Sequence, residues 1–401
     1  MNLRTPQSVA LLGLTGLLLA ACGPQNGTAK PDPDTLTAPA APVVGQATEL
    51  QDVPAAFDRA TTTLEGLLDP ASPDFDPDLK VVLGALGRSE APNLTASPLN
   101  LGRDLTRALA RRGAGGIRPL DLSVNPGSEQ ALPTGTLTID AAGKASYSEK
   151  PSTGYVEVDQ RKGTTLTVDW HVGGAPTVWV DYPQGSGSAA FKQEVPTHAS
   201  ATFTKGNRKL AAAQLSLTPG ACLDRVGPEA LSLSGWAGRE NNAPAALDLR
   251  YAWTDSGITL KASAVYRTRT RGAEAAVNLD LRGSTAYRCT PALAFTPTRA
   301  DLTASVKVPG DQVQATLNLR KLSNLVISDA ELKAKSPFAR VTGDLSASVQ
   351  HNGQPLLTAF GPLADGADLN LLPGDQVVVR YVEHGKLVET NLPDALEKLL
   401  P

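Results

Sequence analysis

Two groups of acidic side chains could bind a hard cation such as calcium, which prefers carboxylate and carbonyl oxygens. The first group alternates along the chain as Asp74, Asp76 and Asp78. Leu79 and Ala85, however, stand where an EF-hand loop needs Gly and Glu. The second group lies in a loop with Gly and Pro, and consists of Asp365, Asp368, Asn370 and Asp375. Surface turns use the same residue types to cap backbone groups. We therefore expect turn capping at both places and no cofactor, with calcium as the alternative.

Three arginines at alternate positions, Arg267, Arg269 and Arg271, could bind a phosphate, a carboxylate or a lipid head group. On a single strand they would share one face. The simpler expectation is cross-strand pairing with acids such as Glu274 or Asp280. Binding of an anionic head group is the alternative.

Catalytic motifs are absent from the sequence. The histidines are far apart, at His171, His198, His351 and His384. No spacing typical of a zinc or copper site occurs, and no nucleophile elbow or phosphate-binding loop is present. His351 and His384 each lie beside a turn, where an exposed histidine is expected. The sequence thus predicts a protein that is not an enzyme, and a hydrolase with a discontinuous site is the disfavoured alternative.

The N-terminus has the pattern of a secretory signal. One basic residue, Arg4, precedes the apolar run from Val9 to Ala21, which is shorter than the roughly 20 residues of a membrane-spanning helix. The run ends in Leu19-Ala20-Ala21-Cys22, which resembles the lipobox of bacterial lipoproteins. A plain cleaved signal peptide is the alternative.

The lipobox resemblance implies that residues 1–21 are removed and that Cys22 carries a thioether-linked diacylglycerol and an amide-linked acyl chain such as palmitate. Two or more chains anchor a protein stably in a membrane. Gly23, rather than Asp, follows the cysteine. The resemblance therefore favours the outer over the inner membrane of a cell envelope that has both.

Two cysteines remain after the anchor is assigned, Cys222 and Cys289. An even pair in an exported protein favours a disulfide, and two buried free thiols are the alternative.

The mature chain loses only Arg4 among its charged residues, so its formal charge changes from −3 to −4. An acidic chain without a basic stripe argues against a nucleic-acid partner. Aromatic residues make up only 4% of the chain, which disfavours a sugar-binding face and a transmembrane barrel.

Five segments follow from composition and periodicity. They are a signal peptide (1–21), a lipid anchor with a flexible tether rich in Pro, Ala and Thr (22–50), a helical and irregular lead-in (51–133), a first β block (134–220) and a second β block with a C-terminal helix (221–401). The lead-in contains two predicted helices, near 57–68 and 100–113. One continuous sheet system is the alternative to two β blocks.

Alternation of apolar and polar residues predicts the strands. Early strands are expected at 153–159, 164–171, 177–182, 199–205 and 208–217, and the most regular alternation lies between 245 and 350. Turns are predicted at Ala141-Ala142-Gly143, Asn352-Gly353 and Glu383-His384-Gly385. The predicted fold is mainly β, with long antiparallel strands in a large curved sheet, sandwich or half-barrel, two short N-terminal helices and a C-terminal helix.

Taken together, these features predict a lipid-anchored cell-envelope protein with a non-enzymatic binding or scaffolding role. The expected partners are the membrane, through acylated Cys22, and an envelope protein or a hydrophobic ligand. The alternative is a carrier of lipid or another hydrophobic ligand in a half-barrel cavity. Such a carrier needs an unfilled apolar concavity. Room for one could come from the alanines on the apolar faces: Ala262, Ala264, Ala275, Ala304, Ala315 and Ala347.

Overall fold

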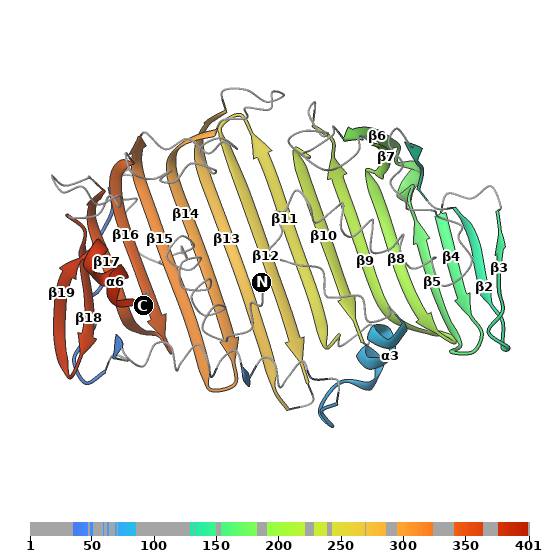
Figure 1. The fold of residues 1–401 in the computed structure, drawn as a ribbon, viewed down its shortest axis with the longest axis horizontal. Helices are drawn as coiled ribbons and strands as arrows, with labels where there is room; N and C mark the ends of the chain where they lie inside the picture. The colour runs from blue at the N-terminus through green and yellow to red at the C-terminus, as the bar shows by residue number, and fades with distance from the viewer. Residues whose placement is uncertain are drawn as a thin grey trace. The chain divides into compact units, whose positions relative to one another are not determined.

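A computed structural model describes sixteen stretches of the chain: residues 35–46, 49–50, 59, 62–63, 69, 71–85, 129–132, 134–149, 154–182, 191–220, 228–238, 243–268, 270–285, 295–323, 341–363 and 376–399. Long strands dominate these stretches (Figure 1), which confirms the mainly β prediction. The chain divides into two compact units. Unit 1 comprises residues 1–72, 253–265 and 270–401, and unit 2 comprises residues 73–252 and 266–269. Between the two runs of strands, the division falls near residue 252.

Unit 2 contains a sheet with the strand order β11-β10-β9-β8-β5-β4-β2-β3. Its strands are β2 (Gly135–Ile139), β3 (Ala145–Ser148), β4 (Gly154–Asp159), β5 (Thr164–Asp169), β8 (His198–Lys205), β9 (Arg208–Thr218), β10 (Ala230–Ala237) and β11 (Ala245–Thr254). A second sheet of the unit has the order β1-β7-β6, from β1 (Glu129–Gln130), β6 (Thr177–Tyr182) and β7 (Phe191–Pro196). The strands predicted between 153 and 217 are confirmed within one or two residues, whereas β1, β7 and β10 were not individually predicted.

Unit 1 contains strands in the order β19-β18-β17-β16-β15-β14-β13-β12. They are β12 (Gly257–Arg267), β13 (Gly272–Thr285), β14 (Phe295–Val308), β15 (Asp311–Ser323), β16 (Thr342–His351), β17 (Gln354–Leu363), β18 (Val378–Glu383) and β19 (Lys386–Asn391). From β13 to β19, consecutive strands pair antiparallel with their neighbours in the chain. The prediction of long antiparallel strands is therefore confirmed.

Among the strand pairs whose register the structure describes, two are parallel. β2 pairs in parallel with β4, and β1 pairs in parallel with β7. β3 already occupies one edge of β2 as the second strand of a hairpin. β4 therefore pairs with the other edge of β2, and it runs in the same direction as β2.

Two of the predicted turns have the backbone that tight hairpins require. Asn352 and Gly353 have φ of 51° and 78°, and His384 and Gly385 have φ of 49° and 69°. Positive φ at both central positions matches the right-handed twist of the paired strands, and Asn and Gly adopt it readily. The Ala141-Ala142-Gly143 turn likewise joins β2 and β3.

Each unit has its own apolar core. In unit 1 the core follows strands β14 to β18 and includes Ala315, Val379 and Tyr381, all 0% exposed. In unit 2 the core includes Leu166, Trp170, Phe203 and Leu210. Two helices cover parts of these cores (Figure 1): α3 (Pro77–Ala85) contacts β9 and β10, and α6 (Leu392–Leu399) contacts β18 and β19.

The helices compare unevenly with the prediction. α6 confirms the C-terminal helix, with Pro393 in its first turn. α3 was not predicted. In the first predicted helix only Arg59, Thr62 and Thr63 are described, and they are helical. The second predicted helix, 100–113, lies outside the described residues.

Candidate functional site

An apolar cavity of about 350 Å³ lies on the sheet of unit 2. We call it the alanine hollow. Its lining comes from α3, β5 and strands β8 to β11, and consists of Val82, Leu166, Ala201, Thr202, Phe203, Ala211, Ala212, Ala213, Gly235, Trp236, Ala237, Ala245, Ala246 and Leu247. The volume falls within the roughly 300–1,000 Å³ range of small-molecule sites.

Strand register explains why space remains at this place. Ala213 of β9 lies between Ala201 of β8 and Gly235 of β10. Two residues further along the strands, at the next position on the same face, Ala211 lies opposite Ala237, and Ala237 lies opposite Ala245. Four neighbouring strands thus place their smallest side chains at adjacent positions on one face. In the next row along the same face, β9, β10 and β11 carry larger residues: Leu215, Leu233 and Leu249.

A β-bulge shapes one end of the hollow. The pairing of β8 with β9 shifts between Phe203 and Thr204, so that Phe203 faces Ala211 and Thr204 faces Lys209. Leu210 is the extra residue, and it is 1% exposed in the core of unit 2. A bulge of this kind bends the strand and redirects its side chains. Here it brings Leu210 into the core directly beside Ala211.

The chemistry of the lining is that of a hydrocarbon site. Among the described residues, none of those that line the hollow is charged. Thr202, Ala212, Trp236 and Ala246 alternate with the inward residues, so their side chains point to the opposite sheet face. On that face the ammonium of Lys209 lies 5.9 Å from the Trp236 ring centroid. Shape and apolar contact are therefore what the hollow offers a ligand.

The sequence predicted that alanines leave room for an apolar ligand, but the alanines that line the hollow are different ones. Of the six named as sources of space, Ala315 and Ala347 are buried in the core of unit 1, and none of the six lines the hollow. The run Ala211-Ala212-Ala213 was the available signal. Without alternation in polarity, that run does not tell which residues face inward.

Several residues proposed for chemistry lie outside the described stretches. They are Cys22, Cys222, Cys289, Arg269, Asp365, Asp368, Asn370 and Asp375. The acylation, the disulfide and the second acidic cluster therefore stay predictions.

The first acidic cluster begins a helix. The Asp76 carboxylate accepts hydrogen bonds from the backbone N–H groups of Asp78 and Leu79, both at 2.9 Å. This is the N-cap of α3, with Pro77 at the first helical position. Asp78 forms an ion pair with Arg208 of β9. The expectation that this cluster caps backbone groups is thus confirmed for Asp76.

The predicted row of three arginines on one strand is wrong. β12 ends at Arg267, and Arg271 lies in the connection before β13. Asp280, expected as a partner, forms an ion pair instead with Arg282 of its own strand.

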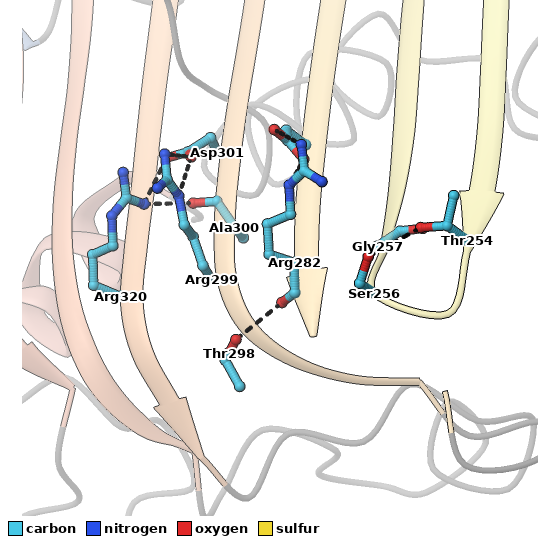
Figure 2. A network of polar contacts seen from close by, with 10 residues as sticks. Thr254, Ser256, Gly257, Arg282, Thr298, Arg299, Ala300, Asp301 and Arg320 are labelled. Carbon is cyan, nitrogen blue, oxygen red and sulfur yellow. Dashed lines mark hydrogen bonds and ion pairs between the residues drawn. The ribbon is translucent and has the colours of Figure 1, made fainter. Parts of the chain in front are cut away.

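A different arginine group is built into unit 1 (Figure 2). The Asp301 carboxylate of β14 forms ion pairs with the guanidinium groups of Arg320 and Arg299, each at 2.6 Å. The Arg320 guanidinium also donates to the carbonyl oxygens of Leu319 and Ala300. The Arg320 side chain is only 8% exposed, so it serves the stability of the sheet.

Of the two histidines predicted to be exposed beside turns, the structure confirms one and not the other. His384 is exposed, as predicted. His351 is not: its ring Nε2 lies 2.8 Å from Asp311, and its side chain is 11% exposed. The prediction for His351 is wrong because the turn after β16 lies beside the turn after β14, which covers the histidine ring. Two hydrogen bonds join these turns: the Asn352 side-chain oxygen accepts from the backbone N–H of Gln312, and the backbone N–H of Asn352 donates to the Gln312 carbonyl oxygen.

Among the described residues, no group of three or more His, Cys, Asp or Glu side chains could hold a metal ion. Within the same stretches, no helix is long and apolar enough to cross a membrane. No protein-family model, curated protein or solved structure matches this chain.

One carboxylate in unit 2 gives a pH-dependent prediction. Asp159 at the end of β4 is buried, which works against its ionisation. Hydrogen bonds from the Arg161 side chain and the Lys162 backbone, with the charges of both residues, outweigh burial and hold the pKa of Asp159 below its ordinary value. The ionised group therefore stabilises the folded state above about pH 4, and this contribution is lost as the pH falls through the lowered pKa. Asp159→Asn is expected to lower the unfolding temperature at pH 7 and to flatten its decline below pH 4, measured by thermal unfolding at several pH values. Parallel curves for the two proteins would contradict the assignment.

Proposed function

We propose that this protein is a lipid-anchored component of a bacterial cell envelope, without catalytic activity, that binds a small apolar ligand in the alanine hollow of unit 2. The alanine hollow is the observation that carries the ligand-binding part of this proposal. It combines an uncharged lining with a volume suited to a small molecule. The anchoring part depends on the resemblance of Leu19-Ala20-Ala21-Cys22 to a lipobox.

Hydrophobic transfer supplies the affinity in such a site, at about 25 cal/mol per Å² of apolar surface removed from water. A ligand that covers the hollow also removes its alanine and leucine walls from water. Specificity for a ligand then comes from the shape of the hollow, because its lining offers few polar groups that could orient a ligand. Such recognition suits a carrier or sensor of hydrocarbon-rich molecules better than an enzyme.

A scaffolding role without a ligand is the second candidate. It is favoured by exposed apolar side chains on the sheet of unit 1, among them Val277 and Val306, each 37% exposed. Exposed apolar surface is typical of surfaces that meet other proteins. Native mass spectrometry of protein purified from its own host's envelope separates the candidates. Ligand binding predicts a non-covalent apolar adduct, and scaffolding predicts a bare chain.

A further inference from the structure

The segment expected to be a flexible tether contacts the strands and core of its own unit, unit 1, at three places. The Ser346 hydroxyl of β16 donates a hydrogen bond to the carbonyl oxygen of Thr37, at 3.1 Å. Leu50 is 7% exposed and belongs to the apolar core of unit 1. Glu49 bonds to the turn between β18 and β19. The hydrogen bonds of Thr37 and Glu49 join residues that are more than 300 positions apart in the chain.

The contact of Glu49 is the most specific of the three. Its two carboxylate oxygens accept from the backbone N–H groups of His384 and Gly385, at 3.0 and 2.8 Å. Both turn residues have positive φ, and successive N–H groups in such a turn form a concave site for an anion. These two N–H groups are not used by the β18–β19 ladder, which pairs Glu383 with Lys386. Glu49 thus satisfies them with charge-assisted hydrogen bonds.

We infer that residues 35–46 and 49–50 form a strap docked on the β strands of unit 1, so that only residues 23–34 tether this unit to the membrane. The consequence for the membrane rests on the proposed acylation of Cys22. Thirteen residue steps separate Cys22 from Thr35, and a fully extended chain spans about 3.5 Å per step. The start of the strap therefore stays within about 45 Å of the anchor, whatever path the intervening residues take. A tether free up to residue 50 would allow about twice that reach.

Hydrogen exchange of the β18–β19 turn tests the strap. The full chain is purified in detergent, and exchange of the His384 and Gly385 amides is followed by mass spectrometry. Glu49→Ala is expected to speed the exchange of these two amides about tenfold or more, because it removes a charged acceptor. Glu49→Gln keeps one acceptor oxygen and is expected to restore part of the protection. The matched control is Val44→Ala, since Val44 lies on the strap but is 47% exposed.

Equal exchange in wild type and Glu49→Ala overturns the strap. Faster exchange in Glu49→Ala, with Val44→Ala unchanged, supports it. The same spectra give the mass of the N-terminal peptide. A protected turn on a chain whose Cys22 is unacylated keeps the strap but removes the membrane tether, so failure of the strap and failure of the proposed anchor are distinguishable.

Discussion

Ala213→Phe is expected to weaken binding of a fluorescent long-chain fatty-acid probe to the purified protein by about 10- to 100-fold. Ala213 lies at the centre of the alanine hollow, between Ala201 and Gly235. A phenyl ring at this position occupies the space that the ligand would take. A ligand forced against the new ring overpacks the site, which costs about 1–3 kcal/mol, and each 1.4 kcal/mol changes affinity tenfold. The measurement is a fluorescence titration of the probe.

Gln214→Phe is the matched control for this titration. Gln214 is the next residue of β9, is exposed, and points to the opposite face of the sheet. The same added ring should therefore leave probe affinity unchanged. Equal weakening by both substitutions, or by neither, would contradict a ligand site in the hollow.

Asp301→Ala is expected to destabilise unit 1 by about 3–5 kcal/mol. Asp301 is the ion-pair partner of Arg320, whose side chain is 8% exposed, and it also bonds to Arg299 (Figure 2). Removing one member of a buried ion pair takes a negative charge away from the other member in a poorly solvated place. Thermal unfolding followed by circular dichroism should show a drop in midpoint on the order of 10 °C for a unit of this size.

Two further variants make the stability prediction specific. Glu389→Ala removes the partner of Arg380 in an exposed pair of the same unit, and surface pairs contribute about 0–1 kcal/mol. Its midpoint should hardly change. Adding Arg320→Met to Asp301→Ala removes the buried guanidinium charge as well, and should recover most of the lost stability. A small effect of Asp301→Ala alone would show that solvent reaches Arg320.

The sequence was sufficient to predict elements that depend on local pattern. Alternation through Val277, Leu279 and Leu281 predicts β13, because period two is the signature of a half-buried strand. Asn352-Gly353 predicts a tight hairpin, because these residues adopt positive φ at low cost. Both features are encoded within a few neighbouring residues.

The features that were missed depend on contacts between distant residues. The alanine hollow exists because Ala201, Gly235 and Ala245 come into register with β9, and no local pattern specifies that register. The strap depends on Glu49 meeting a turn 335 positions later. α3 did have a local signal, since Asp76-Pro77 is an N-cap followed by proline at the first helical position. Alternating acids concealed it by suggesting a cation loop.

Native mass spectrometry of the protein purified from its own host's envelope tests the central claim most directly. The proposed function predicts a chain that begins at Cys22, carries the mass of its acyl groups, and holds one apolar molecule that is lost on denaturation. The Ala213→Phe variant from the same host should retain the acyl mass and lose the adduct. A wild-type chain that is bare in the native spectrum, or an adduct that persists in Ala213→Phe, would contradict ligand binding in the hollow.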